Sequence, residues 1–94
     1  YKLWLAHGVT TVRGVSFTFG PGDRSLADAQ RSAANRITAP RLFPYVVVGD
    51  GWNGGRVDTP EQGRAWTRWA AKSGYHGVKL FLDQPPAVTA AVLD

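Results

Sequence analysis

Strand-like runs alternate with helical patterns along the whole chain, and this alternation constrains the fold more than any other feature of the sequence. Three runs rich in β-branched and apolar residues, at 9–15, 42–48 and 77–82, predict strands. Helical patterns separate these runs and follow the last one. Such an order favours parallel strands joined by right-handed helical crossovers, either in an open sheet or in part of an eight-stranded barrel.

The helical segments show start and stop signals of unequal strength. Residues 1–7 predict the end of a helix, with Gly8 as its left-handed cap. Ser25 opens the next helix with Asp28 three residues later, a weak form of the capping box, and this helix stops before Pro40. Its expected apolar face consists of Leu26, Ala29, Ala33 and Ile37.

The third helix is predicted most firmly, because Thr59 is a good cap and Pro60 and Glu61 suit the first turn. Gly74 closes it, and a final helix follows Pro85. The apolar face of the third helix is Ala65, Trp66, Trp69 and Ala70, and a basic stripe of Arg64, Arg68 and Lys72 recurs at intervals of four. We expect that stripe to be an ordinary solvated face.

Lys79 interrupts the otherwise apolar run 77–82. Burying an unpaired ammonium group is costly, so a lysine in a buried strand is usually neutral, paired or chemically changed. Strand parity places Gly77, Lys79 and Phe81 on one face and Val78, Leu80 and Leu82 on the other, which we expect to meet the helices. The alternative is a lysine that extends from the strand to solvent.

Composition sets a few limits on the 94-residue chain. With 44% hydrophobic residues it can form one small domain, and without cysteine it has no disulfide framework or thiolate metal site. The net charge is +4, but the basic residues are scattered, so we expect no nucleic-acid partner. No apolar stretch approaches the roughly 20 residues of a membrane span, so we expect no membrane partner, and localisation stays open. Helical patterns reach both ends, so we expect a fragment.

Three segments, 5–13, 39–43 and 77–81, in their order and spacing, resemble the metal-dependent amidohydrolases, in particular the imidazolonepropionase-like and prolidase-like branch. The glycine-valine-threonine-threonine-valine motif at 8–12 is the most specific part. The pattern departs at Gly14, where many relatives have aspartate. The resemblance implies an α/β fold that is a partial TIM (β/α)8 barrel, strands two to four with flanking helices, so that residues 1–94 are a fragment of a single barrel domain.

The resemblance also implies a chemistry. Lys79 would be carboxylated on its amine and act as a metal ligand for one or two divalent ions, preferably zinc, with the remaining ligands outside this chain. Burial lowers the pKa of a lysine, the neutral amine can add carbon dioxide, and the carbamate is an anionic oxygen ligand. The implied activity is hydrolysis of amide-type C–N bonds, in a small cyclic amide or a dipeptide, by metal-activated water. The isolated chain should be inactive.

Loop residues after the first two predicted strands are the candidate substrate contacts, because parallel α/β folds bind substrates at the carboxyl ends of strands. These residues are Asp50, Trp52, Asn53, Phe17 and Phe19. The alternative for them is ordinary loop structure with glycine turns. His7 and His76 each precede a strand, so we expect them at the amino-terminal, structural end.

A second class of function stays open. In this alternative, the chain is a non-catalytic α/β interaction module that binds a partner through the basic helix face. Either class is compatible with an oligomer.

Overall fold

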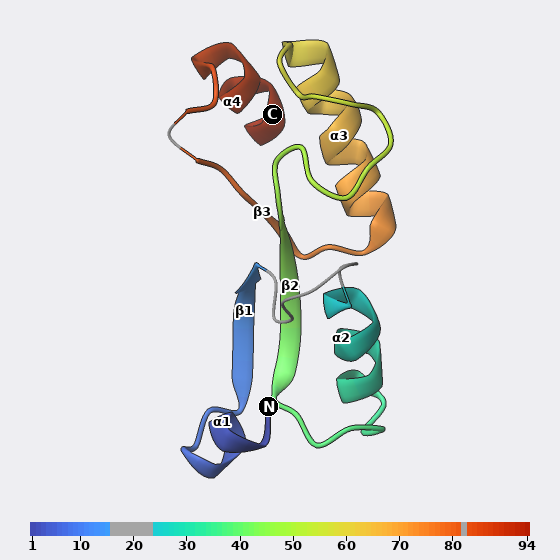
Figure 1. The fold of residues 1–94 in the computed structure, drawn as a ribbon, viewed down its shortest axis with the longest axis vertical. Helices are drawn as coiled ribbons and strands as arrows, with labels where there is room; N and C mark the ends of the chain where they lie inside the picture. Colours follow the sequence, from blue (N-terminus) through green and yellow to red (C-terminus); the bar gives the residue numbers. More distant parts are fainter. Residues whose placement is uncertain (16–23, 82) are drawn as a thin grey trace.

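The computed structural model describes residues 1–15, 24–81 and 83–94. Helices and strands alternate through this part of the chain (Figure 1). Their bounds are α1 (Lys2–Ala6), β1 (Thr11–Val15), α2 (Ser25–Ala33), β2 (Arg41–Val47), α3 (Pro60–Ser73), β3 (Gly77–Lys79) and α4 (Pro86–Leu93). No helix in these described ranges is both long and apolar enough to cross a membrane.

The three strands form one parallel sheet in the order β1-β2-β3. The three predicted strands and their parallel direction are therefore confirmed, although the third covers only Gly77–Lys79 of the predicted run 77–82. β1 pairs with the first five residues of β2, from Thr11 opposite Arg41 to Val15 opposite Tyr45. β3 pairs only with the last three residues of β2, so the outer strands are staggered along the central one (Figure 1).

The expectation of a partial TIM barrel is wrong, because the described residues form an open three-stranded sheet with four helices. Pairing between β2 and β3 stops at Lys79, since the chain leaves β2 through a turn in which the Asp50 N–H donates to the Val47 carbonyl (2.9 Å). The molecule is elongated, at 43 × 24 × 23 Å. Its radius of gyration of 14.7 Å exceeds the about 12 Å typical of a compact domain of this length.

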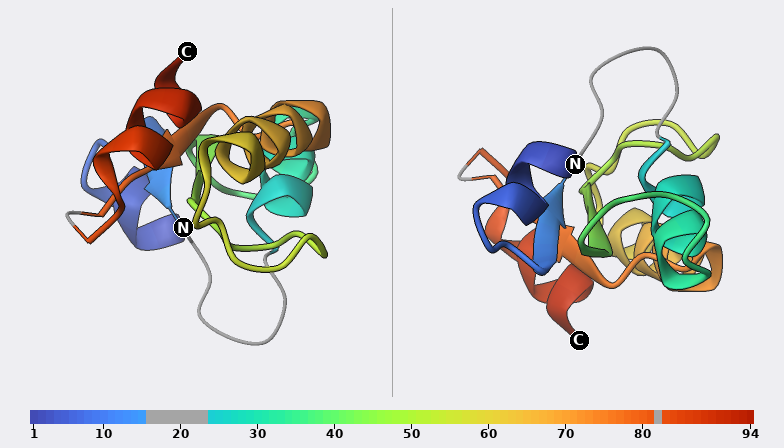
Figure 2. Two further views of the ribbon diagram at one scale, coloured as in Figure 1. Left: turned by 90° about the horizontal axis from the view of Figure 1, so that it is seen from above. Right: turned by 90° about the horizontal axis from the view of Figure 1, so that it is seen from below.

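One face of the sheet meets the helices α2 and α3, which lie together on one side of β2 (Figure 2). Leu42, Pro44 and Val46 of β2 point to this side and are buried. Val78 lies opposite Val46 in the register and packs against the same core. The predicted orientation of β3, with Val78 toward the helices and Lys79 on the opposite face, is thus confirmed.

The main core lies where α3 packs against α4 and the end of β2. Trp66 and Val88 are fully buried there and pack with Val46 and Val92. The predicted signals of α3 are confirmed: Thr59 forms a complete capping box with Gln62, and the left-handed cap is Gly74, with φ +94°. The stripe of Arg64, Arg68 and Lys72 is exposed, as predicted.

Helix α2 differs from its prediction at both ends. Its N-cap is Arg24, and Ser25 is its first residue, so the predicted capping box is wrong. The helix ends at Ala33 and not at Ile37, because Asn35 adopts a positive φ of 55° and the Arg36 N–H closes back on the Arg31 carbonyl (2.7 Å). Asparagine tolerates this left-handed conformation and commonly ends helices.

The buried residues of α2 are polar and not the apolar set that helical spacing predicted. Asp28 accepts a hydrogen bond from the Tyr1 hydroxyl (2.8 Å), and Ser32 donates one to the Pro40 carbonyl (2.6 Å). Ala33, expected in the apolar face, is exposed. Side-chain hydrogen bonds to the residue before α1 and to the chain before β2 therefore fix this side of the helix.

Candidate functional site

Lys79 is the last residue of β3 and so lies at the carboxyl end of the sheet. It pairs with Val47, on the face turned away from α2 and α3. Lys79 was expected in a buried strand, but its side chain is exposed. Its Nζ lies 5.6 Å from the centroid of the Phe81 ring, within the range of a cation–π contact.

Tyr45 is the neighbour of Lys79 that sequence reasoning missed. It pairs with Gly77, two residues before Lys79 on the same face of the sheet. A Cβ atom added at Gly77 would lie 2.8, 2.9 and 2.9 Å from Cε1, Cδ1 and Cζ of Tyr45. The Tyr45 ring therefore occupies the space in which any other residue at position 77 would place its side chain.

A pocket of about 270 Å³ lies at the carboxyl ends of β1 and β2. Val15, Tyr45 and Val47 line it from the strands, and Asp50 and Gly51 from the loop that follows β2. Of the predicted substrate contacts, Asp50 lines this pocket, whereas Trp52 and Asn53 do not, and the predicted metal ligand Lys79 lies outside it as well. Tyr45 therefore connects the pocket beside Asp50 with the strand of Lys79.

Internal hydrogen bonds shape the loop after β2. The buried indole of Trp66 donates to the Asp50 carbonyl (3.1 Å), and Trp52 Nε1 donates to the Gly55 carbonyl (2.9 Å). The Asp50 and Asn53 side chains are exposed. Asp50 is thus available to a bound molecule, whereas the indole N–H of Trp52 is used within the loop. Phe17 and Phe19 lie outside the described residues.

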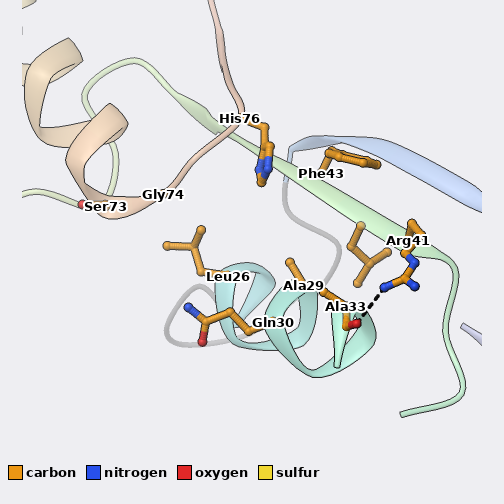
Figure 3. A pocket seen from close by; sticks show the side chains of 10 residues that line it. Leu26, Ala29, Gln30, Ala33, Arg41, Phe43, Ser73, Gly74 and His76 are labelled. Carbon is orange, nitrogen blue, oxygen red and sulfur yellow. Dashed lines mark hydrogen bonds between the residues drawn. The ribbon is translucent and has the colours of Figure 1, made fainter. Parts of the chain in front are cut away.

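A second pocket, of about 220 Å³, lies at the opposite, amino-terminal end of the sheet (Figure 3). Leu26 and Ala29 of α2 line it, with Arg41 and His76 at its rim. Arg41 is held by the end of α2, where its Nη1 donates to the Ala33 carbonyl (2.8 Å). The pocket is distant from the strand ends at which parallel sheets bind substrates.

Both histidines lie where the sequence predicted, before a strand. His76 precedes β3 and meets the Phe43 ring edge to face, with centroids 5.1 Å apart. His7 follows α1, and its Nδ1–H donates to the Leu3 carbonyl (2.7 Å).

A metal ion needs several ligands, and the described residues do not bring three histidine, cysteine or carboxylate side chains together. The contact of the Lys79 amine is the aromatic ring of Phe81, which cannot act as a metal ligand. The described residues by themselves therefore do not make up a metal centre, which would need ligands from outside them.

Comparison of the chain with models of protein families, with curated proteins and with solved structures finds no match.

Proposed function

We propose that this chain is part of a metal-dependent hydrolase that cleaves amide-type C–N bonds, in a cyclic amide or a dipeptide. Lys79 supplies one of the metal ligands. The supporting observation is its position at the carboxyl end of β3, on the face turned away from α2 and α3. Parallel α/β sheets bind their substrates beyond the carboxyl ends of the strands. The sequence segments that resemble the amidohydrolases include this strand.

In this proposal Lys79 becomes a metal ligand after its amine reacts with carbon dioxide. Once deprotonated, the amine adds to the carbon of carbon dioxide: a new N–C bond forms, one C–O π bond breaks to give an anionic oxygen, and a proton passes from the nitrogen to water. The resulting carbamate has anionic oxygens, which suit divalent metals. The other ligands must come from outside the described residues. A bound metal would polarise the substrate carbonyl and activate water.

Two lysine variants of the full-length protein test the proposal. Lys79→Ala should abolish hydrolysis of cyclic amides and dipeptides, and a short carboxylic acid added to the assay should restore part of it by replacing the carbamate. Lys72→Ala is the matched control, because Lys72 is an exposed lysine on the solvent face of α3. Equal turnover in the wild type and both variants would contradict the proposal.

A second candidate function is a non-catalytic interaction module. The observation that favours it is the exposure of Arg64, Arg68 and Lys72 along one face of α3. Arg64 also forms a long ion pair, in which its Nη2 lies 3.8 Å from a carboxylate oxygen of Asp94. Such a face suits an acidic protein surface. Reversing the charge of Arg68 and Lys72 together would then abolish binding of an acidic peptide and leave any hydrolysis unchanged.

A further inference from the structure

The contact between Tyr45 and Gly77 has a defined geometry. Three consecutive ring atoms of Tyr45 are almost equally distant, at 2.8–2.9 Å, from the position of a Cβ on Gly77. An approach to the ring edge would leave one atom much closer than its two neighbours. Gly77 therefore faces the flat side of the ring, and the ring covers the backbone of β3 at this residue.

This ring lies on the face of the sheet to which Lys79 also points. Residues two apart on a strand point to the same face, so Lys79 follows Gly77 on the face that Tyr45 covers. Diagonal neighbours on adjacent strands are about 7–8 Å apart, within reach of aromatic and long side chains. The ring blocks those conformations of Lys79 in which its aliphatic stem would fold back over Gly77.

The Lys79 side chain, which the Tyr45 ring restricts toward Gly77, contacts the aromatic ring of Phe81 in the other direction. Lys79 Nζ lies 5.6 Å from the Phe81 ring centroid, and Phe81 follows the strand at the carboxyl end of the sheet. Tyr45 also lines the pocket that Asp50 lines. Tyr45 is thus the residue that this pocket shares with the contact on β3, whereas Lys79 itself lies outside the pocket.

We propose that Tyr45 is a positioning residue for Lys79, and that residue 77 is glycine because the Tyr45 ring must lie over it. A free lysine side chain loses rotamer entropy when it is fixed, so a ring that removes conformations in advance favours the reactive arrangement. The effect of Tyr45 on the Lys79 side chain is independent of the proposed function. Its effect on hydrolysis rests on that function.

Four variants separate positioning from general packing. Tyr45→Phe keeps the ring, Tyr45→Ala removes it, and Gly77→Ala pushes it aside by the new methyl group. The double variant, with alanine at both positions, contains the methyl group but no ring to displace. It should therefore resemble Tyr45→Ala, so that Gly77→Ala has almost no further effect once the ring is gone.

The measurement is an NMR spectrum of the lysine ε-methylene groups in the full-length protein with ¹³C-labelled lysine. The Lys79 signal is assigned by its loss in Lys79→Arg, and Lys72, exposed on α3, is the internal control. We expect the Lys79 signal to move and become more mobile in Tyr45→Ala and Gly77→Ala, to stay near its wild-type position in Tyr45→Phe, and the Lys72 signal to stay unchanged in all variants. An unchanged Lys79 signal in folded Tyr45→Ala would overturn the positioning role.

Turnover in the same variants separates this inference from the proposed function. If both are right, Tyr45→Ala lowers kcat by about ten- to a hundredfold, the loss typical of a reacting group misplaced by about 1 Å, with a smaller change in KM, and Tyr45→Phe restores it. If the Lys79 signal responds as expected but Lys79→Ala retains full turnover, the proposed function is wrong and the positioning of Lys79 stands. If Gly77→Ala does not fold, Tyr45→Ala and Tyr45→Phe decide the question.

Discussion

The indole N–H of Trp66 donates a hydrogen bond to the backbone carbonyl of Asp50 (3.1 Å), although the two residues are 16 positions apart in the chain. Trp66 is fully buried in the core between α3 and α4. Asp50 lies in the loop after β2 and lines the pocket at the carboxyl ends of the strands. One side chain therefore fixes the main helix of the core to the loop of the candidate site.

Replacing Trp66 by phenylalanine should destabilise the protein and loosen this loop. The substitution keeps an aromatic ring but removes the donor to the part-buried Asp50 carbonyl, and such a hydrogen bond contributes about 0.5–1.5 kcal/mol. Urea denaturation followed by circular dichroism measures the loss. Trp52→Phe is the control, because the Trp52 indole bonds to Gly55 within an exposed loop, and its loss should be much smaller. Equal losses would contradict the importance assigned to the Trp66–Asp50 bond.

Removing the cap of α3 should also lower stability. The Thr59 side chain accepts a hydrogen bond from the Gln62 N–H (3.3 Å), and the Gln62 side chain accepts one from the Thr59 N–H (3.0 Å). Thr59→Ala removes the first of these bonds, and such caps contribute about 1 kcal/mol. The free energy of unfolding of Thr59→Ala and of Thr38→Ala, a change in an exposed loop, checks this expectation. An effect no larger than that of Thr38→Ala would mean that the cap is energetically unimportant.

Gly74 should resist substitution for a conformational reason. Its φ is +94°, and an added Cβ would lie 4.0 Å from Leu26 Cδ2. There is room for a methyl group, so the cost of Gly74→Ala comes from the left-handed backbone and should be about 1 kcal/mol or more. Gly74→Asn should be milder, because asparagine adopts this conformation more readily. Thermal unfolding of both variants gives the order, and an alanine variant as stable as the wild type would contradict it.

Sequence patterns predicted the features of this fold that depend on local chemistry. The caps at Thr59 and Gly74 and the parallel order of the strands follow from such patterns, and so does the opposite orientation of Val78 and Lys79. Each of these features is set by a few neighbouring residues or by the period of two in a strand. The family resemblance and the activity that it implies remain predictions.

Features that depend on distant partners could not be predicted in the same way. β3 stops at Lys79 because the chain turns away after Val47, which no pattern within 77–82 reveals. The buried face of α2 is polar because Asp28 and Ser32 find partners in Tyr1 and Pro40. The ring of Tyr45 over Gly77 likewise required the register between two strands.

Two exposed apolar side chains suggest that the chain associates with itself. Phe81 is 54% exposed and Leu93 is 68% exposed, and both line a groove beside α4. Apolar surface of this kind favours association. Sedimentation velocity of the 94-residue chain should show larger species as the concentration rises, and Phe81→Lys should shift the distribution toward the monomer. A monomer at all concentrations would contradict this expectation.

The metal content of the full-length protein tests the central proposal most directly. Mass spectrometry of metal in the wild type, Lys79→Ala and Lys72→Ala gives the number of ions per chain. We predict one or two divalent ions in the wild type and in Lys72→Ala, and a clear loss in Lys79→Ala together with the loss of hydrolysis, because the variant lacks one anionic ligand. Equal metal content and equal turnover in all three proteins would contradict the account and leave Lys79 an ordinary exposed lysine at the end of a strand.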